Sequence, residues 1–334
     1  MGLKFNENDI RPQIYDKRKM AKIAIDIRRL AKRRKEFARV NCPACDSKNN
    51  RFIFSKFSFN FTECQACRTV FMNPRATPAI LNDFYAHSAV YEFWNKYIFP
   101  ASEKTRKEKI MKPRLERILQ LAKKYGLKPD FLVEVGSGFG TFCEAAIESG
   151  KFKRVAAVEP SASLAETCRV KGIEVIEKTI EEIKKFDFPP SIIVSFEVIE
   201  HLYSPFEFLK NCRRLMKKSS IIAVTCPNWL GFDMMTLGRD SDGVDQEHIN
   251  LFNPDSLQSL FERAGFQVLE CFTPGELDAD IVRNKILQKK IDISGQPFLK
   301  QVLLDNWEKL GAAFQDFLKA NRLSSHMWLV ARKK

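Results

Sequence analysis

The chain has 334 residues, and its 55 lysines and arginines against 41 aspartates and glutamates give a net charge of +14. This length accommodates one large α/β domain and a smaller module. No run approaches the roughly 18 consecutive apolar residues of a membrane span, and the N-terminus lacks the apolar stretch of a signal peptide. We therefore expect neither a membrane-spanning nor an exported protein.

Nine cysteines are present, an odd number, and four of them form two Cys-x-x-Cys pairs. This pattern favours thiolates in a reducing compartment over a disulfide framework. We therefore expect a cytoplasmic location.

Residues 1–40 carry 13 lysines and arginines against 5 aspartates and glutamates, which is +8 of the net charge. Within this basic arm Met20, Ile23, Ile27 and Leu30 recur at helical spacing. One interpretation is a basic amphipathic helix that binds an acidic partner, an acidic membrane surface or RNA. The other is a helix packed on its own domain with a solvated outer face. The rest of the chain is only mildly basic, so charge alone does not favour nucleic acid.

Residues 41–72 contain Cys42-Pro-Ala-Cys45 and, after eighteen further residues, Cys64-Gln-Ala-Cys67. Each pair predicts a tight turn that directs two sulfur atoms at one point, and two such turns complete a tetrahedral Zn²⁺ site. Four thiolates close the site to substrate, so the expected role of the metal is structural. Two matched pairs disfavour a redox role, while iron in place of zinc stays open. Between the pairs, alternating aromatic residues predict a short hairpin: Phe52, Phe54, Phe57, Phe59 and Phe61.

After a helical segment over residues 73–126, with an amphipathic helix predicted at Ser102–Lys124, residues 127–334 alternate strands and helices. This alternation is typical of a doubly wound α/β fold. One helix is predicted from Ser163, which has capping-box spacing to Glu166, as far as Gly172, and another at Asp255–Ala264. The predicted strands are Phe131–Val135, Arg154–Glu159, Ile173–Glu177, Ile192–Phe196, Ile221–Thr225, Phe266–Phe272 and His326–Ala331.

The first of these strands runs into a glycine turn, Phe131-Leu-Val-Glu-Val-Gly-Ser-Gly-Phe-Gly140, where backbone can approach a ligand closely. Glu159 ends the next strand, where a carboxylate can bind a ribose. A nicotinamide-binding fold shares both features, but its glycines follow the spacing GxGxxG, which Gly136, Gly138 and Gly140 do not.

This order resembles the first motif of class I S-adenosylmethionine-dependent methyltransferases, which have a seven-stranded, Rossmann-like sheet. The resemblance continues through Glu197–His201, Thr225–Asn228 and Asp245–Phe252. It implies that residues 73–126 cover the cofactor pocket and line the acceptor site, although this segment can equally serve as a simple connection. The helical insertion at about residues 274–324, between the last two strands, is either a lid or a dimer surface.

The resemblance also assigns cofactor-binding roles. Backbone at Gly136, Ser137, Gly138 and Gly140 approaches the methionine and ribose portion, and Glu134 orders the turn or the methionine amino group. Glu159 accepts hydrogen bonds from the ribose hydroxyls. Thr179 or Ile180 contacts adenine, and Phe196 and Glu197 lie at the edge of the reaction centre.

Glu197, Glu200 and His201 have the spacing of one helical face. With His248 from a later loop they resemble the divalent-metal site of metal-assisted O-methyltransferases, namely the ubiquinone-pathway enzymes and those that methylate the 2′-hydroxyl at small-RNA ends. There a cation lowers the pKa of the acceptor hydroxyl. Alternatively, the site holds no metal, either histidine is the general base, and the glutamates are scaffold.

A four-cysteine segment ahead of such a core resembles bacterial methyltransferases of sugar and polysaccharide pathways. We expect O-methylation of a sugar, a nucleotide sugar or a related polar small acceptor. The alternatives are sugar C-methylation, RNA 2′-O-methylation, and a non-catalytic binding scaffold. No RNA-binding module is recognisable in the sequence, so nucleic acid is not favoured, and the oligomeric state is not indicated.

Overall fold

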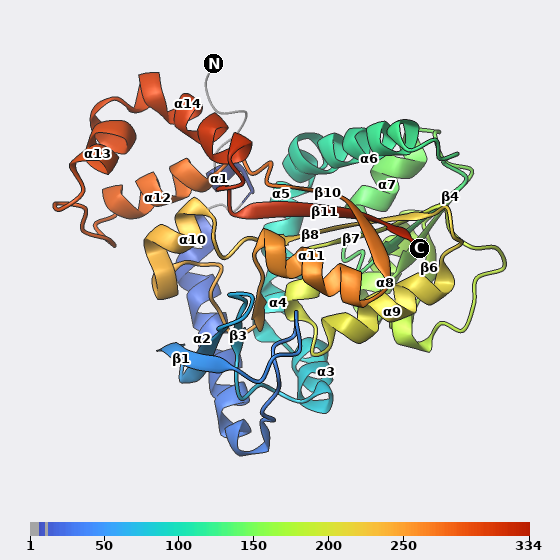
Figure 1. Ribbon diagram of the computed structural model, residues 1–334, viewed down its shortest axis with the longest axis horizontal. Helices are drawn as coiled ribbons and strands as arrows, with labels where there is room; N and C mark the ends of the chain where they lie inside the picture. The colour runs from blue at the N-terminus through green and yellow to red at the C-terminus, as the bar shows by residue number, and fades with distance from the viewer. Residues whose placement is uncertain (1–6, 11–12) are drawn as a thin grey trace.

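A seven-stranded sheet forms the centre of the computed structural model, which describes residues 7–10 and 13–334 (Figure 1). The parts of the basic arm at residues 1–6 and 11–12 lie outside the described residues. The strands follow the order β6 (Glu174–Ile176), β5 (Arg154–Val158), β4 (Phe131–Val135), β7 (Ile192–Phe196), β8 (Ile221–Pro227), β11 (His326–Lys333) and β10 (Phe266–Phe272). All pairs are parallel except those of β11, which runs antiparallel to both neighbours. The predicted doubly wound α/β class is confirmed.

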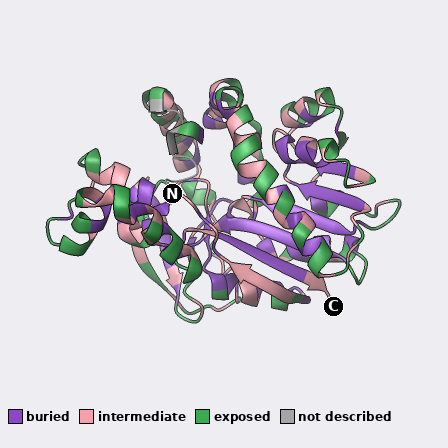
Figure 2. Cartoon of the chain, turned by 90° about the horizontal axis from the view of Figure 1, so that it is seen from above, coloured by how far each residue is buried: buried purple, intermediate pink, exposed green. Residues whose placement is uncertain are grey.

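Helices cover both faces of this sheet, and its central strands β5, β4, β7, β8 and β11 are largely buried (Figure 2). One face packs against α6 (Lys112–Lys124), α7 (Thr141–Glu148) and α8 (Ala162–Val170), and the other against α9 (Pro205–Leu215) and α11 (Pro254–Arg263). Strands buried on two faces explain the nearly continuous apolar runs in the sequence.

The predicted capping box at Ser163 and Glu166 is wrong. Helix α8 begins one residue earlier, at Ala162, and Ser161 occupies the N-cap position. The backbone N–H of Ser161 donates to Glu159 Oε1 at 2.9 Å. The carboxylate at the end of β5 therefore binds an N–H group at the start of the helix, and the chain enters the helix without the expected cap.

The cysteine-rich segment forms a second, antiparallel sheet that includes a strand of the core. Its order is β1 (Asn50–Lys56), β2 (Phe59–Cys64), β3 (Val70–Met72) and β9 (Asn250–Leu251). The pairs Val70↔Leu251 and Phe71↔Asn250 join β3 to β9. The ribbon, as we call residues 41–72, is thus hydrogen-bonded to the chain that follows His248.

The basic arm contains α1 (Glu7–Ile10), η1 (Gln13–Tyr15), α2 (Asp16–Lys32) and η2 (Arg34–Glu36). Helix α2 packs on its own chain: Leu30 is buried, and the buried Asp26 carboxylate accepts hydrogen bonds from Ser88 Oγ, Ala89 N and Val90 N. These bonds fix the start of α4 (Ala89–Phe93), because carboxylates stabilise helix N-termini. The described part of the arm is therefore attached to the segment that follows the ribbon.

That segment consists of α3 (Pro78–Ala86) and then a nearly continuous helical run from α4 to α6. The run passes through a π-helical turn η3 (Trp94–Ile98), α5 (Phe99–Arg106) and a second π-helical turn η4 (Lys107–Met111). The Phe99 ring stacks on the Phe139 ring of the glycine turn at 4.1 Å between centroids. The predicted amphipathic helix at Ser102–Lys124 is therefore the end of a longer helical cover that contacts this turn.

The insertion contains α12 (Asp278–Leu287), α13 (Pro297–Lys300), η8 (Gln301–Asp305) and α14 (Trp307–Ala320), which lie at the upper left of Figure 1. These helices have their own apolar cluster, shared with Leu237 of α10 (Phe232–Leu237). The remaining short helices are η5 (Ile180–Glu182), η6 (Ile199–His201) and η7 (Gly238–Asp240). Among the described residues, no helix combines the length and the apolar character that crossing a membrane requires.

Candidate functional site

The glycine turn connects β4 to α7 through three residues with positive φ, at Gly136 (+76°), Gly138 (+54°) and Gly140 (+67°). A Cβ at Gly136 would lie 2.5 Å from Val198 Cγ2, so packing requires glycine there. At Gly138 no neighbouring atom lies within 4 Å of such a Cβ. Gly138 is therefore the position where the backbone faces open space that a ligand can fill.

Glu159 lies against this open position. Its Oε2 accepts a hydrogen bond from Gly138 N at 2.8 Å, and only 5% of the residue is exposed. Burial raises the pKa of the carboxyl, while the N–H groups of Ser161 and Gly138 oppose that rise. Each carboxylate oxygen has a second lone pair, so Glu159 can still accept hydrogen bonds from ligand hydroxyls.

The other predicted cofactor residues surround this turn. Glu134 is buried, accepts a hydrogen bond from Cys143 Sγ at 3.1 Å, and has its pKa raised to about 8 by that burial. Ser137 is buried within the turn itself. Thr179 forms the N-cap of η5, where its backbone N–H donates to Glu182, while Ile180 is buried in the core. Phe196 packs against Phe142 and Trp328.

Glu197 does not share a helical face with Glu200 and His201. Its φ is +56°, a left-handed conformation, and η6 begins only at Ile199. The side chain turns instead toward β8, β11 and α6, where its Oε1 contacts Thr225 Oγ1 (2.6 Å), His326 Nε2 (2.9 Å) and Arg114 Nη2 (3.3 Å). Burial would raise the pKa of Glu197, but His326 and Arg114 hold it well below its usual range. The predicted four-residue group is therefore divided in two.

The other three residues of that group do come together. Ligand atoms of Glu200, His201 and His248 all lie within 4.8 Å of one another. His201 Nδ1 bonds to Glu247 O at 3.2 Å and His248 Nδ1 to Gly243 O at 3.0 Å, which leaves both Nε2 atoms for a ligand. The two imidazole centroids are 4.7 Å apart.

Glu200 is 1% exposed, and neither of its carboxylate oxygens has a hydrogen-bond partner among the described residues. Burial raises its pKa well above the usual range, and burial also lowers the pKa of His201 to about 3. Unpaired oxygens beside two imidazoles are a donor set that fits a divalent cation. We call these three residues the Glu200 cluster.

Asn250 of β9 holds the backbone of this cluster in place. Its Nδ2 donates to the carbonyl oxygens of Glu200 (3.2 Å) and Leu202 (2.8 Å), and its Oδ1 accepts from Arg75 Nη1 at 2.8 Å. Arg75 is itself fully buried at the end of the ribbon. The sequence analysis did not identify Asn250, because its role depends on strand pairing.

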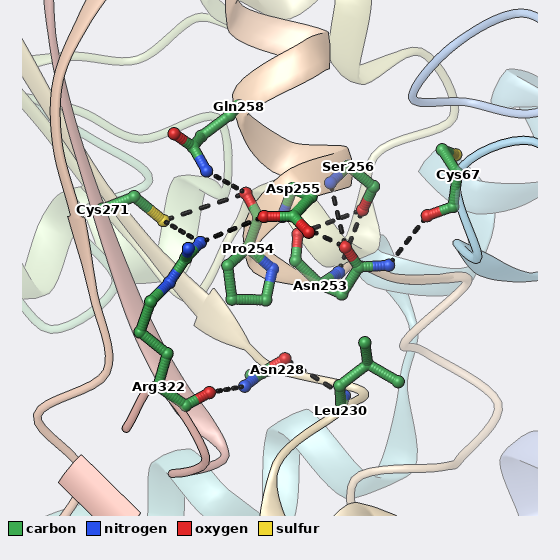
Figure 3. A network of polar contacts seen from close by, with 10 residues as sticks. All are labelled: Cys67, Asn228, Leu230, Asn253, Pro254, Asp255, Ser256, Gln258, Cys271 and Arg322. Atoms are coloured by element: carbon green, nitrogen blue, oxygen red, sulfur yellow. Dashed lines mark hydrogen bonds and ion pairs between the residues drawn. The ribbon is translucent and has the colours of Figure 1, made fainter. Parts of the chain in front are cut away.

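The four predicted zinc ligands also meet. Sγ atoms of Cys42, Cys45, Cys64 and Cys67 lie within 4.8 Å of one another, with Cys42–Cys67 and Cys45–Cys64 each at 3.5 Å. Bonds of about 2.3 Å to a tetrahedral zinc place sulfurs about 3.8 Å apart, so the arrangement fits that metal. Figure 3 shows how the knuckle is fixed: Asn253 Nδ2 donates to Cys67 O, while Asn253 Oδ1 caps the start of α11.

Sequence reasoning also missed His326, Arg114 and Thr225. A signal for His326 existed, because it is one of four histidines and begins the predicted last strand. An antiparallel strand begins at the edge where parallel strands end, which is where ligands bind in such sheets. The position of Arg114 depends on how the helical cover packs against the sheet, and no pattern in the sequence predicts that packing.

Comparisons with known proteins identify the family of the chain. A family model described as a methyltransferase domain matches residues 104–271, just over half of the chain. A probable S-adenosylmethionine-dependent methyltransferase of Mycobacterium tuberculosis is 33% identical over 98 residues, 29% of this chain and 34% of that protein. A ubiquinone biosynthesis O-methyltransferase of Bradyrhizobium diazoefficiens is 28% identical over 120 residues, 33% of this chain and 45% of that protein.

The chain thus matches a third to just under half of the length of these curated relatives. Among solved structures, a methyltransferase from Archaeoglobus fulgidus is similar with a TM-score of 0.47 and 22% identity, covering 71% of this chain and all of that one. One from Clostridium acetobutylicum gives a TM-score of 0.48 and 11% identity, covering 72% of this chain and 99% of that one.

Proposed function

This chain belongs to the methyltransferase-domain family, and from that premise we propose that it methylates a hydroxyl of a sugar, a nucleotide sugar or a related polar acceptor, with S-adenosylmethionine as donor. The choice of donor rests on the buried Glu159 carboxylate, whose Oε2 lies 2.8 Å from Gly138 N. The backbone at Gly138 faces open space beside it. This pair can hold a ribose at the edge of the sheet.

In the proposal, Gly136, Ser137, Gly138 and Gly140 supply backbone to the methionine and ribose portion, and Glu159 binds the ribose hydroxyls. Glu134 stabilises the glycine turn. Thr179 borders the adenine, and Phe196 borders the reaction centre. The bound donor supplies an electrophilic sulfonium methyl group. The protein aligns the acceptor oxygen with it and removes the hydroxyl proton.

We assign the Glu200 cluster to a divalent cation that orients the acceptor hydroxyl and lowers its pKa. The unpaired oxygens of Glu200 and the two available Nε2 atoms favour this assignment. The ubiquinone-pathway relative is an O-methyltransferase by name.

The remaining assignments are proposals of the same kind. The four cysteines hold a structural zinc, the protein acts in the cytoplasm, and the acceptor belongs to glycan or polysaccharide synthesis. Exposed lysines and arginines of α2 offer a surface to an acidic partner or membrane.

Calorimetry with S-adenosylmethionine tests the donor. We expect the wild type to bind it and Glu159→Ala to bind at least about tenfold more weakly, since hydrogen bonds to a charged group contribute about 1.5–3 kcal/mol. Glu177→Ala, an exposed carboxylate nearby in the sequence, is the matched control and should bind as the wild type does. Equal affinity in Glu159→Ala and the control would refute the assignment.

The acceptor is tested by measuring S-adenosylhomocysteine release with a panel of nucleotide sugars, with and without chelator and added Mg²⁺. Turnover that the chelator abolishes and Mg²⁺ restores supports the cation. Turnover that is insensitive to both removes the cation from the proposal while leaving the donor assignment intact.

A further inference from the structure

The histidine nearest to Glu197 is not part of the Glu200 cluster, and its surroundings are those of a proton acceptor. His326 is the first residue of β11 and lies opposite Pro227 of β8. Side chains two residues apart share a face of a strand, so His326 lies on the same face as Trp328. Phe196 of β7 packs against Trp328 and against Phe142 of α7, and α6 and α7 cover this face. His326 is thus beside the carboxyl end of β7, on the side of the glycine turn.

A carboxylate orients the imidazole. His326 Nε2 lies 2.9 Å from Glu197 Oε1 and 3.2 Å from Arg114 Nη2. The contact with the carboxylate is the shorter one, and since an ionised carboxylate only accepts hydrogen bonds, we assign the proton to Nε2. The other nitrogen, Nδ1, then bears the free lone pair, and none of the described residues hydrogen-bonds to it. A carboxylate that fixes the tautomer and stabilises the protonated ring is the arrangement of a general base.

Glu197 is held in this orientation by several constraints. Its left-handed backbone, at φ +56°, is uncommon for a residue with a side chain and costs about 1–2 kcal/mol. Thr225 Oγ1 and Arg114 Nη2 bond to the same oxygen that meets His326. Arg114 Nη2 thus reaches both members of the pair, at 3.3 Å from Glu197 Oε1 and 3.2 Å from His326 Nε2, and fixes the carboxylate beside the ring.

The pair remains accessible to an acceptor. About 29% of the His326 side chain and 39% of the Glu197 side chain are exposed, whereas Arg114 behind them is 12% exposed. By contrast, His201 and His248 face each other and each has Nδ1 bound to a backbone carbonyl oxygen. The two groups of residues therefore suit different tasks.

We propose that His326, oriented by Glu197, takes the proton of the acceptor hydroxyl during methyl transfer. The acceptor oxygen forms a bond to the methyl carbon, the bond from that carbon to sulfur breaks with its electron pair going to sulfur, and the hydroxyl proton passes to His326 Nδ1. The products are a methyl ether, a neutral thioether and an imidazolium paired with Glu197. This inference deepens the proposed function and depends on it.

The test uses ¹⁵N-histidine NMR on the full chain, which has only four histidines. We expect the His326 ring nitrogens to show the Nε2–H tautomer, and Glu197→Gln to disturb it. We expect S-adenosylmethionine to move the His326 resonances more than S-adenosylhomocysteine does, because only the former carries the sulfonium charge and methyl group. His87, which is exposed on α3, should not respond to either. Assignment uses His326→Gln or, if that variant fails to fold, the three other single histidine variants by elimination.

Calorimetry on the same samples separates the two hypotheses. Donor binding with unmoved His326 resonances overturns the role of His326 and leaves the proposed function standing. Absence of donor binding overturns both. With an acceptor from the panel, His326→Gln should lower kcat by about 10²–10⁴ while the donor Kd stays unchanged, and added imidazole should restore part of the rate. A kcat within threefold of wild type would overturn the proposal.

Discussion

Single backbone conformations decide which residues of the site act together. Glu197 and Glu200 have helical spacing in the sequence, but the positive φ of Glu197 sends its side chain to His326 while Glu200 meets His201 and His248. The glycine turn also contains left-handed residues, but glycine adopts this conformation without a steric cost. Packing against Val198 leaves no room for a side chain at Gly136, whereas the space beside Gly138 is open to a ligand.

Substitution at Gly138 should separate ligand binding from folding. Gly138→Ala and Gly126→Ala both place alanine at a positive φ, +54° and +65°, with no neighbour within 4 Å of the new Cβ. Each should cost about 1 kcal/mol of unfolding free energy, measured by urea denaturation. Only Gly138→Ala should weaken S-adenosylmethionine binding, by tenfold or more, in calorimetry. A similar loss in Gly126→Ala would contradict the assignment.

Glu134 should make stability depend on pH. Its pKa is raised by burial to about 8 in the folded chain, against about 4.3 unfolded. Between these values the folded state binds more protons than the unfolded state, so this contribution is present in full below pH 4.3 and is lost as pH rises toward 8.

Replacing Glu134 by the neutral, isosteric glutamine removes that dependence. Relative to wild type, Glu134→Gln should therefore gain more than about 1 kcal/mol of unfolding free energy between pH 5 and pH 8. Urea denaturation at both pH values measures it. A difference between the two proteins that stays constant with pH would show that Glu134 titrates normally in the folded state.

At the scale of elements, the ribbon is a structural part of the core. Strand β3 pairs with β9, which directly follows His248, and Asn250 of β9 binds the carbonyl of Glu200. Asn253 then connects Cys67 to the N-terminus of α11. Hydrogen bonds of β3, β9 and Asn253 therefore connect the cysteine-rich ribbon to the backbone of the Glu200 cluster.

Loss of the proposed zinc should therefore destabilise the whole chain. Cys64→Ser should reduce bound zinc from about one equivalent to near zero by elemental analysis, and lower Tm by several degrees, because binding free energy of a structural metal is folding free energy. Cys271→Ser, at a half-buried cysteine outside the cluster, should keep its zinc. Unchanged Tm in Cys64→Ser, or zinc below about half an equivalent in wild type, would argue against the metal.

At the scale of the whole molecule, a buried carboxylate joins the two ends of the insertion to each other, beside the site. Asp278, at the start of α12, accepts hydrogen bonds from Ser324 Oγ (2.7 Å), Gln315 Nε2 (2.6 Å) and the backbone N–H of Ser325, the residue before His326. A Cβ at Gly275 would lie 3.4 Å from His326 Cβ, so the beginning of the insertion lies beside this histidine. The insertion therefore borders the proposed acceptor side.

Asp278→Ala should loosen the two ends of the insertion without affecting donor binding. Leaving buried partners of a carboxylate unpaired costs about 2–3 kcal/mol, and we expect faster proteolysis within residues 273–325, identified by mass spectrometry. S-adenosylmethionine affinity should stay within twofold of wild type. Asp292→Ala, which removes only a local exposed contact with Ser294, is the control. Equal proteolysis of both variants would show that Asp278 does not hold the insertion.

The sequence by itself determined the class of fold and predicted the residues of the proposed donor side. Apolar runs of the right length predict buried parallel strands, and glycine spacing with Glu159 is local chemistry at the end of such strands. The cysteine pairs likewise belong to two short turns, and the structure brings their sulfurs together as the spacing predicts.

Only the tertiary structure brought together the residues of the proposed acceptor side. Arg114, Thr225 and His326 come from three elements, and Glu197 from the connection after β7. These residues are up to 212 positions apart, and their meeting depends on one left-handed residue and on how α6 and β11 dock. Periodicity carries no information about such contacts, because it specifies which face of an element is apolar but not which polar residue lies opposite at its end. The sequence therefore predicted His201 or His248 as the general base, whereas packing places His326 beside Glu197.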